Sequence, residues 1–118
     1  MNGHGTHVAG IIGGKIYGVA KKAELVAIKV LGEDGAGSTS EVIAGLNWAV
    51  RKAKLRGISN CVANMSLAGE YSQALNEAVS AAVESGLTVV VAAGNAGVSF
   101  YCSFHAKGFV LICPARKT

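Results

Sequence analysis

Three apolar runs alternate with two amphipathic stretches along the middle of the chain. The runs at residues 24–31, 61–67 and 87–93 lack polar alternation, which is typical of strands covered on both faces. Between them, apolar residues recur at helical spacing after Ser38 and again from Leu75 to Val83. This order of strands and helices predicts an α/β fold, a three-layer arrangement in which helices cover both faces of a parallel sheet.

The predicted helices have recognisable end signals. Ser38 and Glu41 have the spacing of a capping box before the first amphipathic segment, and Gly57 is placed to end it. Gly86 stands at the C′ position after the second segment, where helices often end in a left-handed residue. Residues 3–14 are expected to form a short helix. Its many small residues lower helix propensity, so we expect another backbone to pass close to it.

Small and polar residues follow each predicted strand, at residues 32–37, 66–69 and 94–95. Ligands of parallel α/β sheets bind outside the carboxyl ends of the strands. The sequence therefore predicts a binding site at this edge of the sheet, where glycine lets the backbone approach a ligand.

The composition is that of one small folded domain. The 118 residues are 51% hydrophobic and 15% charged, which is too apolar for a disordered segment. No apolar run is long enough to cross a bilayer and no cationic leader opens the chain, so we expect neither a membrane partner nor a signal peptide. Much of the net charge of +4 lies at residues 51–56. Because no aromatic residues interleave with these charges, we interpret them as a solvated helix end and expect no nucleic-acid partner.

Residues 98–118 break the pattern of the rest of the chain. They hold the only proline and most of the aromatic residues, with one expected strand at residues 109–113. We therefore divide the chain into a domain at residues 1–97 and a divergent tail at residues 98–118, which is not assumed to share the same fold.

The three cysteines are too few and too scattered for a disulfide framework. Cys61 precedes an apolar strand and is expected to be a buried thiol. Cys102 and Cys113 are able to pair, although nothing in the sequence requires it.

A glycine-flanked histidine, His4, opens the expected N-terminal helix in the segment GHGTHVAG. Without bulky neighbours it is free to reach a partner, which suits a general base. His7 shares its helix face, so a metal site is a second interpretation, although the glutamate of an HExxH motif and a third ligand are lacking. A packed structural histidine is the third interpretation, and the residues alone leave all three open.

An amide side chain, Asn95, directly follows the third predicted strand. In that position its NH₂ group is placed to donate to a developing oxyanion. An Asx turn leaving the strand is the structural alternative.

Four segments taken together resemble the subtilisin-like (subtilase) serine proteases, most nearly their proteinase K-like branch. They are, in chain order, GHGTHVAG, YGVAKKAELVAIKVLGEDGAG, NMSLAG and VVVAAGN. The resemblance runs from about Gly3 to Asn95 and implies a partial subtilisin-like fold. It also implies a serine-type endopeptidase that hydrolyses peptide bonds of extended polypeptides and is secreted.

The resemblance implies roles for single residues. His4 matches the catalytic base and Asn95 the side chain of the oxyanion hole. The edge that pairs with the substrate backbone matches Ser66, Leu67 and Ala68. The opposite edge of the cleft matches Gly35, Ala36 and Gly37. The wall of the primary specificity pocket matches Ala92, Ala93 and Gly94. Structural calcium is common in the family, but no ligand set for calcium or another metal is identified here, and no other cofactor is expected.

The other two members of the catalytic triad have no counterpart among these residues. In the family the acidic residue precedes the histidine and the serine follows it. Asp34, the only aspartate, lies in the cleft-edge loop and is not assigned the orienting role. We therefore predict a fragment of a serine endopeptidase domain that is inactive as it stands. The alternatives are a non-catalytic peptide-binding α/β module and a gene-model or pseudogene product without a stable fold.

Overall fold

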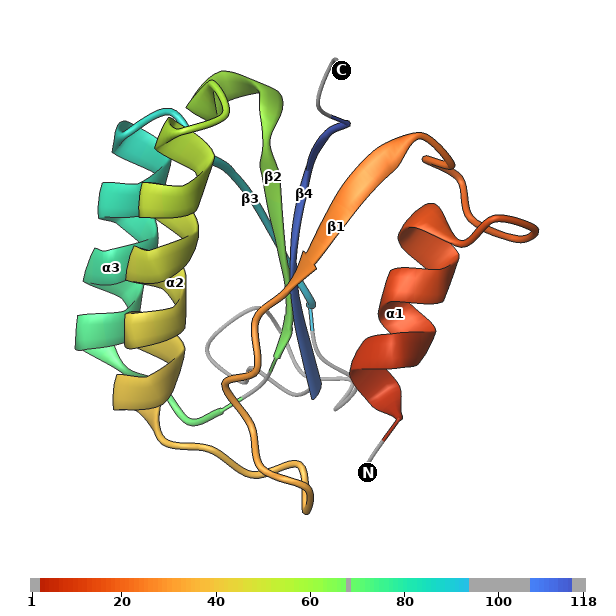
Figure 1. Cartoon of the computed structure of the whole chain (residues 1–118). Helices are drawn as coiled ribbons and strands as arrows, with labels where there is room; N and C mark the ends of the chain where they lie inside the picture. The colour runs from red at the N-terminus through yellow and green to blue at the C-terminus, as the bar shows by residue number, and fades with distance from the viewer. Residues whose placement is uncertain (1–2, 68, 94–106, 116–118) are drawn as a thin grey trace.

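A computed structural model describes residues 3–67, 69–93 and 107–115 in three layers (Figure 1). Two helices, α2 (Thr39–Lys54) and α3 (Gln73–Glu84), cover one face of a sheet, and α1 (His4–Gly13) lies against the other face. The strands of this sheet are β1 (Ala23–Ala27), β2 (Val62–Leu67), β3 (Thr88–Val91) and β4 (Lys107–Pro114), with the 3₁₀ turn η1 (Ile58–Asn60) before β2. The predicted α/β fold with helices on both faces is confirmed.

The sheet is mixed, where a purely parallel one was expected. Its strand order is β1-β4-β2-β3, with β2 and β3 parallel and β4 antiparallel to both β1 and β2. The three predicted strands therefore share one direction, while β4 separates the first two. By pairing with both, β4 supplies backbone partners that β1 and β2 need inside the sheet.

The strand expected inside the divergent tail thus holds a central position in the sheet. Residues 107–114 pair with β1 from Ala23↔Pro114 to Ala27↔Val110, and with β2 from Val62↔Ile112 to Leu67↔Lys107. The part of the tail that the structure describes therefore belongs to the same fold as the rest of the chain. The proposed boundary between residues 97 and 98 lies outside the described residues.

The first strand is shorter than its apolar run suggests. β1 ends at Ala27, and the chain leaves the sheet after the Ile28 N–H donates to the Phe109 carbonyl at 3.1 Å. Val30 then turns into the core beside Gly45 of α2, where a Cβ on the glycine would overlap the Val30 side chain. The end of the run is apolar because it packs under α2, although it is not extended.

The predicted start of α2 and the predicted end of α3 are confirmed, whereas α2 ends at Lys54, before the expected stop at Gly57. The Glu41 N–H donates to the Ser38 Oγ at 3.2 Å, and the Ser38 N–H donates to the Glu41 carboxylate at 2.7 Å, which completes the capping box. In α3 the Ser72 Oγ accepts from the Leu75 N–H, and Gly86 follows the helix with φ +97°.

The glycines of α1 differ in how closely other parts of the described chain approach them. An added Cβ at Gly5 or Gly10 would meet nothing within 4 Å among the described residues. At Gly13 the space is taken, because the new atom would lie 3.1 Å from the Leu25 side chain and 3.4 Å from the Ala20 carbonyl oxygen. In the described part of the chain, the expected close backbone is therefore found at Gly13 and not at Gly5 or Gly10.

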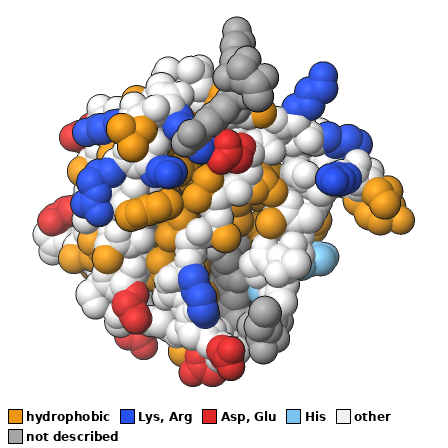
Figure 2. Space-filling view, viewed as in Figure 1, with side chains coloured by type: hydrophobic (Ala, Val, Ile, Leu, Met, Phe, Trp, Pro, Cys, Tyr) orange, Lys and Arg blue, Asp and Glu red, His pale blue; other side chains and the backbone are white. Residues whose placement is uncertain are grey.

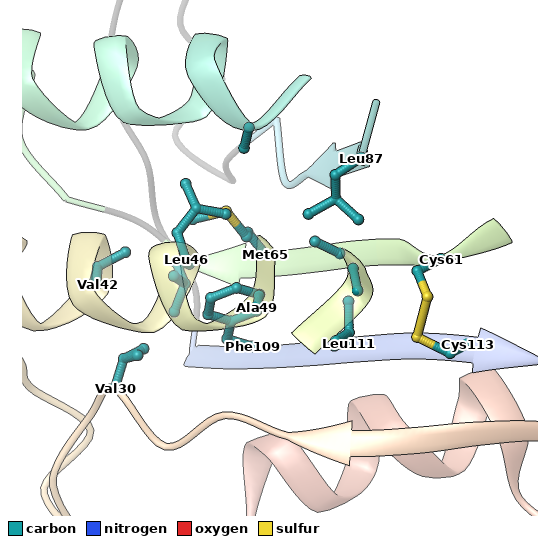
Figure 3. Packing of buried hydrophobic residues seen from close by; sticks show 14 residues of the cluster. Val30, Val42, Leu46, Ala49, Cys61, Met65, Leu87, Phe109, Leu111 and Cys113 are labelled. Atoms are coloured by element: carbon teal, nitrogen blue, oxygen red, sulfur yellow. A yellow bond between two sulfur atoms is a disulfide. The ribbon is translucent and has the colours of Figure 1, made fainter. Parts of the chain in front are cut away.

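The core lies between the sheet and the α2–α3 layer (Figure 3). Its most deeply buried large side chains come from α2, the two central strands and the start of β3: Leu46, Leu87, Leu111, Cys61 and Cys113. The last two form a disulfide. The expected free thiol at Cys61 and the considered pairing of Cys102 with Cys113 are therefore both wrong.

The basic residues near the end of α2 do not act alike. Arg51, Lys52 and Lys54 lie in the last turn, where they complement the helix dipole. Arg56 folds back and binds the Glu24 carboxylate of β1 through both terminal nitrogens. Hydrogen bonding by Glu24 raises the pKa of Arg56, so this cation is part of the fold.

Candidate functional site

His4 is the first residue of α1 and lies at the carboxyl ends of the strands. The helix runs opposite to β1, β2 and β3, so its N-terminus is at the edge where these strands end (Figure 1). Gly3 precedes it with φ 79°, a left-handed conformation that glycine adopts without strain. The glycine before His4 therefore fixes the direction in which the chain enters the helix.

A cavity of about 680 Å³ joins His4 to the chain that follows β1. The first turn of α1 forms one side, and residues 27–33 with Gly35 form another. Val110 and Phe109 of β4 complete the wall. The structure thus brings together two of the residues that the sequence predicted for one site, His4 and Gly35.

The imidazole of His4 has an unsatisfied nitrogen. Nε2 is buried and has no hydrogen-bond partner within the described part of the chain. Asp34 does not supply one, because its Oδ1 accepts from the Ala36 N–H at 3.0 Å and shapes the loop after β1. A turn at Gly32 to Ala36 is closed by the Gly32 N–H donating to the Ala36 carbonyl at 2.7 Å. This arrangement leaves His4 able to exchange a proton with a group that enters the cavity.

The two expected cleft edges have different surroundings. Gly35 is half-buried in the cavity wall, whereas Ala36 and Gly37 are exposed beside it. On β2, Ser66 accepts a hydrogen bond from the Asn64 amide at 2.9 Å and Leu67 is buried in the core. Both residues lie opposite β4 in the sheet. An extended peptide that adds at that side of β2 has to displace the first residues of β4.

The remaining predicted site residues follow β3 or lie outside the described residues. Ala92 is half-buried and donates its N–H to the Met65 carbonyl at 3.3 Å, and Ala93 beyond it is exposed. Both stand at the same edge of the sheet as His4. Ala68, Gly94 and Asn95 lie outside the described residues, so their expected roles stay predictions.

The walls of the cavity contain residues that the sequence motifs did not indicate. Leu25 and Ala27 of β1 and Val110 of β4 line it. Alternation of side chains along a strand is what places them in the wall. The side chains of Phe109 and Leu111 belong to the core under α2, so that of Val110, between them, faces α1. The sequence offered no way to see this before the pairing of β1 with β4 was known.

The described residues give no support to a metal interpretation of His4 and His7. In residues 3–67, 69–93 and 107–115, no three histidine, cysteine, aspartate or glutamate side chains lie close enough to hold an ion. His7 is exposed on α1. No helix among the same residues combines the length and apolarity that a membrane span requires.

Residues 1–112 match the family model described as the Subtilase family. The chain is 55% identical over 97 residues to Subtilisin-like protease 7 of Trichophyton verrucosum, an alignment that covers 82% of this chain and 24% of that protein. It is 53% identical over 98 residues to Subtilisin-like protease 5 of Arthroderma benhamiae, with 82% and 25% covered. Among solved structures, a cold adapted subtilisin-like serine proteinase matches with a TM-score of 0.76 and 47% identity, over 82% of this chain and 34% of that one. The chain therefore spans about a quarter of the length of these two relatives.

Proposed function

The chain belongs to the subtilase family, and we propose that it supplies the histidine-bearing part of a serine endopeptidase catalytic domain. The observation that carries this proposal is the cavity that joins the buried His4 Nε2 to Gly35 at the carboxyl end of β1. The named relatives are subtilisin-like proteases, which supports peptide-bond hydrolysis as the reaction of the longer protein.

In the proposed reaction His4 is the general base. Its imidazole takes the proton of a serine hydroxyl as the oxygen attacks the peptide carbonyl, and returns that proton to the leaving amine. Asn95 is proposed to donate to the oxyanion that forms, an interaction whose loss costs subtilisin itself about a hundred- to a thousandfold in rate. The buried Nε2 of His4 is consistent with the first role, because no described residue holds it in a hydrogen bond.

The substrate is proposed to be a polypeptide in an extended conformation, and the protein to act outside the cell as a secreted enzyme. Gly35, Ala36 and Gly37 on one side and Ser66 to Ala68 on the other are the proposed edges of the cleft. Support comes from the position of Gly35 in the cavity wall with His4. The pairing of Ser66 with Gly108 of β4 makes displacement of that strand part of the proposal.

Among the described residues no serine lines the cavity with His4, so we propose that the chain does not hydrolyse peptides alone. A chromogenic peptide incubated with the purified chain should release product only at the rate of the buffer, and replacing His4 by alanine should change nothing. Covalent labelling of any serine by a fluorophosphonate would contradict this part of the proposal.

The cleft itself is tested by titrating the ¹⁵N-labelled chain with an uncharged, N-acetylated and C-amidated extended peptide. Shifts should appear at His4, at residues 35–37 and at Ser66, with the amide signal of Gly108 changing as β4 gives way. A Gly35→Val variant should lose these shifts, whereas Gly57→Val, at a glycine with a similar positive φ outside the cavity, should keep them. Shifts scattered over α2 and α3 instead would reject both a catalytic and a non-catalytic peptide cleft at this place.

A further inference from the structure

We propose that the cavity beside His4 binds a small carboxylate with an apolar chain, such as a medium-chain fatty acid. This goes beyond the proposed function, since it involves neither a peptide nor hydrolysis. The volume of about 680 Å³ lies within the range typical of small-molecule pockets. The argument comes from the apolar wall of the cavity and from the polar groups at one end of it.

The wall of the cavity is largely hydrocarbon. Leu25 and Ala27 of β1, Val110 of β4 and Ala9 of α1 contribute aliphatic groups from the sheet face that α1 only partly covers. Hydrophobic side chains gather across the middle of the face shown in Figure 2, with charged side chains around them. An apolar chain that enters the cavity removes the aliphatic groups of its wall from water, which favours binding.

The first turn of α1 forms the polar end of the cavity. Gly3, His4, Gly5 and Thr6 all line it. The first hydrogen bond within the helix runs from the His7 N–H to the Gly3 carbonyl at 3.0 Å, so the N–H groups before it have no partner in the helix. In the described part of the chain no side chain caps this end, and its first turn holds no acidic residue. The helix dipole there favours a negative charge.

The His4 side chain independently requires a partner inside the cavity. Its Nε2 is buried and has no hydrogen-bond partner among the described residues, and a buried polar atom in that state is costly. When Nε2 carries a proton, a carboxylate oxygen accepts from it and satisfies it. Lys29 and Glu33 also line the cavity, with opposite charges that offset each other. The preference for an anion therefore comes from the helix end, while the His4 imidazole offers a hydrogen-bond donor when Nε2 carries a proton.

The proposal is tested by titrating the ¹⁵N,¹³C-labelled chain with octanoate, below its aggregation concentration, and with octanamide. Octanoate should shift the amides of residues 4–6 and the methyl groups of Leu25 and Val110 in a saturable manner. Octanamide, which has the same chain length and no charge, should bind at least tenfold more weakly. Equal binding of the two compounds, or no saturable shift with octanoate, would overturn the proposal.

Thr6 offers a matched pair of variants that separates binding from folding. Thr6→Asp places a carboxylate in the first turn, where it suits the helix dipole, and should weaken octanoate binding at least tenfold. Thr6→Asn, which has nearly the same shape as Thr6→Asp but is neutral, should bind octanoate at least tenfold more tightly than Thr6→Asp. Similar affinities for the two variants would contradict the proposal. The uncharged peptide of the cleft experiment does not probe this anion site, so failure of either proposal is recognised separately.

Discussion

Cys61, immediately before β2, and Cys113, in β4, are joined by a disulfide whose two Cα atoms lie 4.4 Å apart. The adjacent pair Val62↔Ile112 shows that the two cysteines are directly opposite in the antiparallel ladder. A Cα separation of this size is that of a pair without mutual backbone hydrogen bonds. The bond therefore fastens two strands that are already in register, over a sequence separation of 52 residues.

Removing this disulfide should destabilise the chain by about 4 kcal/mol, because closing a loop of this length limits the freedom of the unfolded state. The Cys61→Ser, Cys113→Ser double variant should show this loss in urea denaturation, measured against the oxidised parent. Ser80→Ala, at an exposed position of α3, is the control and should leave the free energy of unfolding within about 0.5 kcal/mol. A double variant as stable as this control would show that the disulfide does not support the fold.

Two glycines in helices should respond to alanine with opposite signs. At Gly45 of α2 a Cβ would overlap the Val30 side chain and lie 3.1 Å from the Ile28 Cγ2, so we expect Gly45→Ala to destabilise by about 1–3 kcal/mol. At Gly10 of α1 a Cβ meets nothing within 4 Å, so Gly10→Ala should stabilise by about 0.5–1 kcal/mol. Urea denaturation of both variants measures the difference, and a gain in stability at Gly45 would show that α2 shifts to make room.

The capping box of α2 should make stability depend on pH. Hydrogen bonds from the Ser38 backbone and side chain hold the pKa of Glu41 below its ordinary value of 4.5. Because the folded pKa is lowered, the contribution is present above the ordinary pKa and is lost as the pH falls through the folded value. The parent chain should therefore have a higher Tm than Glu41→Gln at neutral pH, and the difference should shrink in acid.

Ser38→Ala provides the check on this capping prediction. The loss of the Ser38 Oγ should cost about 1 kcal/mol, as for other N-cap residues. In the Ser38→Ala background, the change of Glu41 to glutamine should have a smaller effect on the acid dependence of Tm than in the parent. An unchanged effect would mean that the Ser38 hydroxyl does not contribute to the pH dependence, because the backbone N–H of residue 38 is kept in this variant.

The ion pair between Arg56 and Glu24 should support the junction of α2 with β1. The Arg56 side chain is only 9% exposed, and both of its terminal nitrogens bind the carboxylate. Lysine keeps the charge but not the paired geometry, so Arg56→Lys should lower Tm. Arg51→Lys, at an exposed position near the end of the same helix, should leave Tm unchanged. Equal Tm values for the two variants would contradict a structural role for the pair.

The sequence was most informative where the signal is local. The capping box at Ser38, the helical spacing in α3 and the stop at Gly86 depend on residues a few positions apart, and each prediction is confirmed. The carboxyl ends of the strands were also expected to form a site, and His4 and Gly35 do share a cavity there. Such features follow from the intrinsic preferences of short segments.

Pairing between distant segments could not be predicted in this way. Nothing near residues 107–114 indicates that they pair with β1 on one side and β2 on the other, because both pairings depend on where the rest of the chain has already folded. The disulfide was missed for the same reason, since Cys61 and Cys113 become neighbours only through that pairing. The cavity wall at Ala27 and Val110 likewise exists only once β1 and β4 lie side by side.

The place of β4 has a consequence for how the molecule is made. β4 follows β1 and β2 in the sequence but lies between them in the sheet, so neither has this partner until residues 107–114 have been synthesised. Folding must then wait for contacts between residues almost a hundred positions apart, such as Ala23 and Pro114, and distant contacts of this kind are slow to form. Until they form, the backbone N–H and C=O groups of β1 and β2 that face β4 stay unpaired. Other chains are then able to pair with them, so we expect aggregation to be most severe during synthesis.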